Sequence, residues 1–174
     1  GSLEGVDTSK RELFDFIEEK GKTQFINYSD PFLKKSAAKY SKSVLYGNGA
    51  SNYIQNIQED QEAGIMHIDL VLDNKSTRCQ SKLFGRFNAE NVLATATVGS
   101  FLGLSLEQIS AGISAYQPNN NRSQVKKTER NVLIIDAYNS NPSSAEKAIL
   151  AFAESTATGK LAIIGAMKEG GDNS

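Results

Sequence analysis

Cysteine and histidine are almost absent from this sequence: its 174 residues include one of each, and there is no tryptophan. The single cysteine, Cys79, excludes an internal disulfide and any chemistry based on a Cys-x-x-Cys pair. One histidine and one cysteine are too few for a His/Cys zinc centre. A bound metal would therefore be a hard ion held by oxygen ligands.

Strong net charge and long apolar runs are also missing. The formal net charge is -1, which gives no global basic field for nucleic acid. No apolar run is as long as a membrane span, and the start of the sequence has no signal-peptide pattern. With 39% hydrophobic and 22% charged residues, the composition is typical of a globular protein, which we expect in the cytoplasm.

The first part of the sequence alternates between helical and strand patterns. An S-x-x-E capping box at Ser9 predicts a helix that ends at Gly21, and Asp30 before a proline predicts the start of a second helix. Short strands are expected at 23–28 and 43–46. This order of elements is typical of a parallel α/β sheet.

The pattern then changes to one of antiparallel strands. Apolar and polar residues alternate over 66–72, which predicts a strand buried on one face, with His67 on the solvent side. A hairpin turn should return the chain as a second strand over 77–84, with Cys79 facing the core. A third antiparallel strand is expected over 53–58.

Two helices and a linker should follow. Small residues dominate 85–102, which predicts a closely packed helix, and a capping box at Ser105 predicts the start of a shorter one. The stretch 117–124 is polar and contains a proline. We interpret it as a linker between one domain over 1–116 and another over 125–174.

An apolar run over 132–135 is mostly β-branched, which predicts a strand buried on both faces of a parallel sheet. Asp136 follows at the edge where open α/β sheets bind ligands, and Asn141 with Pro142 should start the next helix. Residues 160–164 predict a second buried strand, which would complete a right-handed βαβ unit. An ordinary polar turn without a function is the alternative interpretation.

Four stretches together resemble the Mur ligases, the ATP-dependent amide-forming enzymes of peptidoglycan synthesis. The resemblance implies an α/β fold class: a truncated central-domain sheet with an antiparallel β portion, followed by a partial Rossmann-like C-terminal domain. The four stretches are the segment 1–14, F-I-N-Y-S-D at 25–30, G-R-F-N-A-E-N at 85–91, and the two motifs Y-Q-P-N-N-N-R-S-Q and D-A-Y-N-S-N-P within 116–142.

The resemblance implies a nucleotide-binding set. In the family, the second asparagine of the third motif, here Asn91, contacts the adenine ring. The linker arginine, here Arg122, reaches the nucleotide, and the strand-end acid, here Asp136, accepts hydrogen bonds from the ribose hydroxyls. The matching residues are Asn88, Asn91, Arg122, Asp136, Tyr138 and Asn139.

Lys10 matches a family lysine that carbon dioxide converts to a carbamate. The resemblance makes it a catalytic residue and an oxygen ligand for Mg²⁺ near the γ-phosphate of ATP. Without the resemblance, Lys10 is an exposed helix lysine. Four positions depart from the family motifs, since Ser29 and Ala166 replace aspartates, Phe87 replaces a histidine and Ser140 replaces an alanine.

The activity implied by the resemblance is the ATP-dependent addition of D-alanyl-D-alanine to UDP-N-acetylmuramoyl-tripeptide through an acyl phosphate. The phosphate-binding motif G-x-x-G-K-[ST] does not occur in the sequence. We therefore interpret the chain as a piece of such a ligase that turns over nothing alone. Two alternatives stay open: a ligase similar to folylpolyglutamate synthase, and a non-catalytic nucleotide-binding module.

Overall fold

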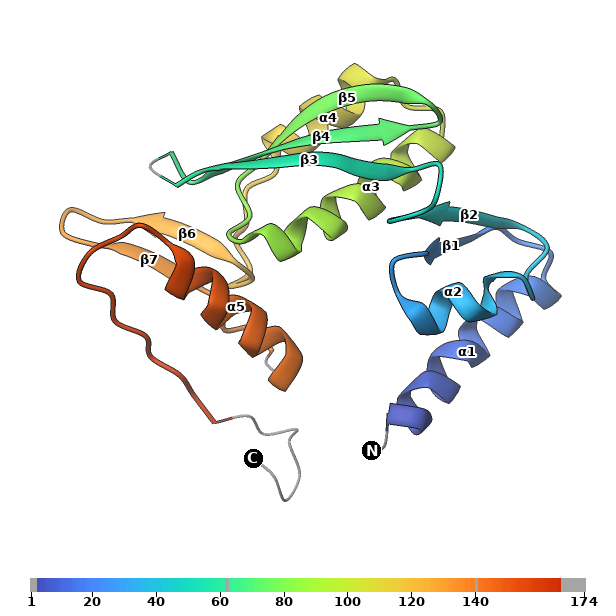
Figure 1. Ribbon diagram of the computed structural model, residues 1–174, viewed down its shortest axis with the longest axis horizontal. Helices are drawn as coiled ribbons and strands as arrows, with labels where there is room; N and C mark the ends of the chain where they lie inside the picture. Colours follow the sequence, from blue (N-terminus) through green and yellow to red (C-terminus); the bar gives the residue numbers. More distant parts are fainter. Residues whose placement is uncertain (1–2, 62, 140, 167–174) are drawn as a thin grey trace.

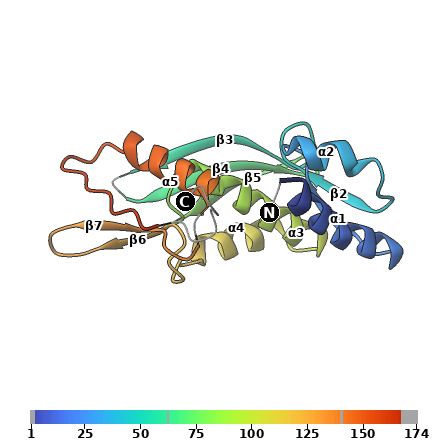
Figure 2. The same ribbon diagram turned by 90° about the horizontal axis from the view of Figure 1, so that it is seen from below.

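The computed structural model describes residues 3–61, 63–139 and 141–166, whose strands form three sheets (Figure 1). In chain order the elements are α1 (Leu3–Glu19), β1 (Gln24–Asn27), α2 (Pro31–Ala37), β2 (Ser43–Tyr46), β3 (Tyr53–Asp60), β4 (Ile65–Leu72), β5 (Lys75–Ser81), the 3₁₀ turn η1 (Arg86–Asn88), α3 (Ala89–Phe101), α4 (Leu106–Ala115), β6 (Gln124–Lys127), β7 (Val132–Ile135) and α5 (Pro142–Glu154). The central sheet is β3-β4-β5, packed against α3 and α4. The pair β1-β2 with α1 and α2 lies at one end of the molecule, and β6-β7 with α5 lies at the other (Figure 2).

The central sheet forms as the alternating pattern predicts. The apolar residues at even positions of β4 are buried, whereas His67 between them is only half-buried. A two-residue turn joins β4 to β5, and the φ angles of Asp73 and Asn74, 48° and 64°, are the left-handed pair that suits a tight hairpin. Cys79 lies opposite Ile68 and is fully buried, and this burial raises the pKa of its thiol. The predicted core face is therefore confirmed.

Helices α3 and α4 complete the core. Ala89 and Leu93 of α3 and Ile109 of α4 are buried in one cluster with the inner side chains of β4. The capping box at Ser105 is confirmed. The predicted helix start at Gly85 is wrong, because Gly85 has a φ angle of 87° and the 3₁₀ turn η1 precedes α3. The last residue of η1 therefore lies directly at the start of α3.

At the N-terminal end, β1 and β2 pair in parallel as predicted. The capping box predicted at Ser9 is wrong, because α1 begins earlier and Ser9 lies inside the helix, where there is no end to cap. The predicted stop is confirmed: Gly21 has a φ angle of 61°, and its N–H donates to the carbonyl of Glu18 at 2.8 Å. Asp30 caps α2 and accepts the N–H of Phe32 at 2.8 Å.

Two carboxylates of α1 hold this helix against the segment that follows α2. Asp15 Oδ1 accepts hydrogen bonds from Lys39 Nζ at 2.6 Å and from the Tyr40 hydroxyl at 3.2 Å. Glu18 accepts the Ser41 hydroxyl at 2.6 Å and the Ser41 N–H at 3.1 Å. The hydrogen bond from Lys39 lowers the pKa of Asp15, and those from Ser41 lower the pKa of Glu18.

We expect acid to loosen α1 before the central sheet. A carboxyl group whose pKa is lower in the folded state stabilises the fold above its unfolded pKa, about 4, and this contribution is lost as the pH falls through the lowered value. Opening free energies of α1 amides, from hydrogen exchange corrected for intrinsic rates, should therefore fall below about pH 4 relative to those of β4. The variant with Asp15→Asn and Glu18→Gln should lack this pH dependence. Equal opening of α1 at pH 6 and pH 3 in the unchanged protein would contradict the prediction.

The C-terminal part differs from the sequence-based expectation. Among the described strands, β7 pairs only with β6, in antiparallel register, and Val132 and Leu133 are 60% and 43% exposed. Residues 160–164 are exposed and carry no regular secondary structure, so the predicted parallel βαβ unit is wrong. Parallel pairing needs a second strand beside β7, and a two-stranded ribbon has too little apolar area to bury both faces. The start of α5 is as predicted, with Asn141 accepting the N–H of Ser144 at 2.9 Å.

The fold class is nevertheless the predicted one, a mixed α/β fold with an antiparallel portion. Within the described ranges, no helix combines the length and the apolar character needed to cross a bilayer. The chain between α4 and β6 returns to the start of α3, where the N–H of Phe84 donates to the carbonyl of Ser123 at 3.1 Å. This return brings residues far apart in the sequence to one place.

Candidate functional site

Asn88 lies where η1 meets α3, and the residue is 6% exposed. Its Nδ2 donates to the carbonyl of Phe84 at 2.8 Å and to Ser123 Oγ at 2.9 Å. Its Oδ1 accepts a hydrogen bond from Asn91 Nδ2 at 3.0 Å. The amide nitrogen and oxygen of Asn88 are thus both engaged within the protein, and they tie the start of α3 to the chain before β6.

The chain around Ser123 is held from two sides. On the side of η1, the carbonyl of Ser123 accepts the N–H of Phe84. On the side of β7, the N–H of Ser123 donates to Asp136 Oδ1 at 3.0 Å, and the N–H of Ala137 donates to the carbonyl of Asn121 at 2.8 Å. Ser123 therefore connects the start of α3 with the end of β7.

Arg122 packs against Tyr138. The guanidinium carbon lies 3.9 Å from the centroid of the Tyr138 ring, an attractive cation–π geometry that orients Arg122 beside the end of β7. In the part of the chain that the structure describes, the guanidinium makes no hydrogen bond or ion pair. Its N–H groups are therefore available to an anionic ligand.

The two residues that flank Arg122 have left-handed backbone conformations. The φ angles are 57° for Asn121 and 47° for Ser123. Such conformations cost on the order of 1–3 kcal/mol and persist where the surroundings over-determine them, as the hydrogen bonds to both residues do here. The asparagine-rich sequence before Arg122 suits this conformation. Nothing in the sequence singles out Ser123, which the sequence analysis missed.

Five of the seven residues singled out from the sequence belong to one network of contacts, which we call the junction network. The members that make the hydrogen bonds or the ring contact are Asn88, Asn91, Arg122, Ser123, Asp136 and Tyr138. Asn139 is exposed in the loop between β7 and α5. The network thus contains five of the predicted residues and one, Ser123, that was not predicted.

The junction network presents groups that suit a nucleotide. Asn91 and Asp136 are exposed. Asp136 uses Oδ1 for Ser123, and within the described residues its second oxygen and the side-chain oxygen of Asn91, Oδ1, make no hydrogen bond. An amide can pair with the edge of a purine, a carboxylate oxygen can accept from a ribose diol, and a guanidinium can bind phosphate. The residues present therefore fit ATP.

Lys10 is not brought to the junction network. It is exposed on α1, and this helix lies at the opposite end of the molecule from β6-β7 (Figures 1 and 2). Across the described ranges, no group of three or more His, Cys, Asp or Glu side chains is placed to hold a metal ion. The assignment of Lys10 as a carbamylated Mg²⁺ ligand stays a prediction from the resemblance.

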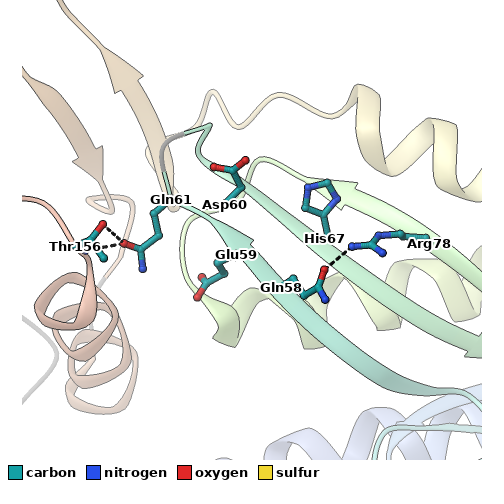
Figure 3. A pocket seen from close by; sticks show the side chains of 7 residues that line it. All are labelled: Gln58, Glu59, Asp60, Gln61, His67, Arg78 and Thr156. Carbon is teal, nitrogen blue, oxygen red and sulfur yellow. Dashed lines mark hydrogen bonds between the residues drawn. The ribbon is translucent and has the colours of Figure 1, made fainter.

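A separate hollow of 610 Å³ lies between the β3–β4 hairpin and the segment after α5, and it shares no residue with the junction network (Figure 3). At one side of it, Gln61 Oε1 accepts the N–H of Thr156 at 2.6 Å and the Thr156 hydroxyl at 2.8 Å. This is a second contact between the central sheet and the C-terminal part. No sequence pattern pointed to it, because both residues are exposed polar residues of ordinary loops.

Comparison with known families identifies the class of protein. Residues 1–99 match the model of the Mur ligase middle domain, and residues 121–174 match the model of the Mur ligase, glutamate ligase domain. Since the first match covers more than half of the chain, this chain belongs to the Mur ligase family. The predicted family is therefore confirmed, and the junction network lies where the two matched regions meet.

Two relatives within this family show the extent of the similarity. The chain is 27% identical over 176 residues to UDP-N-acetylmuramoyl-tripeptide–D-alanyl-D-alanine ligase of Bacillus subtilis (strain 168), covering 99% of this chain and 37% of the relative. It is 30% identical over 166 residues to UDP-N-acetylmuramoylalanine–D-glutamate ligase of Desulfitobacterium hafniense (strain DSM 10664 / DCB-2), covering 88% of this chain and 34% of the relative. The chain thus spans about a third of the length of these relatives.

Solved structures share the fold. A crystal structure of MurF from Acinetobacter baumannii has a TM-score of 0.67 at 21% identity, over 76% of this chain and 29% of that chain. The MurF ligase of Thermotoga maritima, solved in complex with ADP, has a TM-score of 0.65 at 16% identity, over 76% of this chain and 30% of that chain. At these identities the likeness concerns the fold.

Proposed function

We propose that the chain forms part of an ATP-dependent ligase that adds D-alanyl-D-alanine to UDP-N-acetylmuramoyl-tripeptide through an acyl phosphate. In this proposal, residues 1–116 belong to the ATP-binding domain, 117–124 are the linker, and 125–174 belong to the C-terminal domain. The observation that carries the proposal is the meeting of Asn91, Arg122 and Asp136 around Ser123, at the boundary of the two regions that match the family.

Each residue of the junction network has a part in nucleotide binding. Asn91 pairs with the adenine edge through its exposed amide, and the second carboxylate oxygen of Asp136 accepts from the ribose hydroxyls. Arg122 contacts the nucleotide with N–H groups that Tyr138 orients by its ring. Asn139 extends the same loop. ATP supplies the phosphoryl group that activates the carboxylate, and the residues described here bind and orient its nucleoside end.

Coverage supports the choice of D-alanyl-D-alanine as the amine. Three D-alanyl-D-alanine ligases match 99%, 97% and 86% of this chain, whereas the D-glutamate ligase and a 2,6-diaminopimelate ligase match 88% and 86%. The identities are similar, from 26% to 30%, and the support is that the two most extensive of these matches are to D-alanyl-D-alanine ligases. The amine therefore needs a direct test.

Product analysis with the complete ligase that contains this chain tests the proposal. With ATP and UDP-N-acetylmuramoyl-tripeptide, labelled D-alanyl-D-alanine should enter the product, with ADP released in equal amount. Labelled D-glutamate or diaminopimelate, each offered with the acceptor of its own ligase, should not. Incorporation of either amine, or of glutamate into a folate acceptor, would assign a different reaction to the protein.

A further inference from the structure

We propose that Asn88 is a positioning residue that acts through Ser123. The two side chains form a joint between the two family-matched regions, and this joint sets the orientation in which Arg122 and Asp136 contact the nucleotide. The inference rests on the proposed nucleotide-binding function. It departs from the prediction that Asn88 itself belongs to the set that contacts the nucleotide.

The side-chain amide of Asn88 is hydrogen bonded within the protein. The residue is 6% exposed, its Nδ2 donates to Phe84 and Ser123, and its Oδ1 accepts from Asn91. Both N–H donors of this amide are in use, so a ligand could accept from it only if one of these bonds broke, and a buried polar group that loses its partner is costly. Its effect on a nucleotide therefore passes through the residues it holds.

Ser123 uses every polar group it has. Its hydroxyl accepts from Asn88, its carbonyl accepts from Phe84, and its N–H donates to Asp136. These three bonds hold a left-handed serine with a φ angle of 47°. Without the bond to Asn88 the backbone can relax toward an ordinary conformation. That relaxation would turn the adjacent Arg122 and release the bonded oxygen of Asp136.

A separate hydrogen-bonded contact between the two regions offers a matched control. Gln61 and Thr156 are hydrogen bonded across the hollow, but both are exposed and share no partner with the junction network. Gln61→Ala therefore removes a contact between the same two regions without touching Ser123. If the joint depends on the specific geometry at Ser123, this control should not change nucleotide binding.

The test is a double-mutant cycle on ADP affinity, measured by titration of the 174-residue chain. Asn88→Ala and Ser123→Ala should each weaken ADP binding about fivefold, the scale of one hydrogen bond. The double variant should bind about as weakly as either single variant, and Gln61→Ala should bind like the unchanged chain. If the two single effects multiply instead, Asn88 acts independently of Ser123 and the proposal is overturned.

Hydrogen exchange at the Ser123 amide separates this inference from the proposed function. In Asn88→Ala this amide should exchange about fivefold faster, while β4 amides keep their protection. If Asn88→Ala unfolds, the cycle cannot be completed, but Ser123→Ala removes the same hydrogen bond and should by itself weaken ADP binding about fivefold. Absence of ADP binding by the unchanged chain counts against the proposed function. An unaltered Ser123 amide in a folded Asn88→Ala variant counts against the joint.

Discussion

Replacing Ile68 with alanine should lower the free energy of unfolding by about 3 kcal/mol. Ile68 is fully buried at the centre of β4, opposite Cys79 on the neighbouring strand, and it lies in the cluster that includes Leu93 of α3. The loss has two parts, the transfer free energy of the removed methyl groups and the cavity that remains between the sheet and the helix. Urea denaturation, followed by far-ultraviolet circular dichroism, measures the change.

His67→Ala is the matched control for that prediction. His67 is the neighbouring residue in the same strand, it is only half-buried, and its side chain lies on the opposite face of the sheet. Its replacement should change the free energy of unfolding by less than about 0.5 kcal/mol. Equal costs for the two variants would mean that the sheet does not bury the face that contains Ile68.

The contrast between these neighbours explains why the central sheet could be predicted from the sequence. A strand with one buried face carries a period of two in its apolar residues, and β4 shows this alternation from Met66 to Leu70. The left-handed turn residues Asp73 and Asn74 mark its end with equal clarity. In β4 and its turn, the local sequence pattern therefore predicts the same structure that tertiary packing stabilises.

The prediction for β7 failed because the same kind of pattern has two meanings. A continuous apolar run predicts burial on both faces only if other elements supply the covering surfaces. In the structure, β7 has β6 as its described neighbour, and Val132 and Leu133 stay exposed. An apolar run shows that a strand can be buried. The neighbouring elements decide whether it is buried and which strand it pairs with.

The candidate site likewise contains residues that the sequence predicted and one that it did not. Motif resemblance led to Asn91, Arg122 and Asp136. Arg122 and Asp136 follow Asn91 in the sequence by about 30 and about 45 positions. In the structure Asp136 accepts the N–H of Ser123, Arg122 is its neighbour in the chain, and Asn91 is linked to it through Asn88. Ser123 could not be predicted, because its importance comes from a left-handed backbone and three tertiary hydrogen bonds, none of which has a local sequence signal.

Replacing Asp136 with asparagine should weaken ADP binding by the 174-residue chain about tenfold to a hundredfold. Asparagine keeps an oxygen that can accept the N–H of Ser123, so the joint is preserved. It replaces the second carboxylate oxygen by an amide group that donates and cannot accept from the ribose. A hydrogen bond to a charged group contributes about 1.5–3 kcal/mol, which gives this range of affinity. Titration calorimetry with ADP measures the effect.

A nucleotide without ribose hydroxyls makes the Asp136 prediction specific. The unchanged chain should bind 2′,3′-dideoxy-ADP about as weakly as Asp136→Asn binds ADP, and the variant should not distinguish the two nucleotides. Glu129→Gln removes the same charge from an exposed residue in the turn between β6 and β7, and it should leave both affinities unchanged. If Asp136→Asn still prefers ADP by the original factor, the ribose hydroxyls bind elsewhere. The role of Asp136 would then be limited to accepting the N–H of Ser123, a hydrogen bond that asparagine also makes.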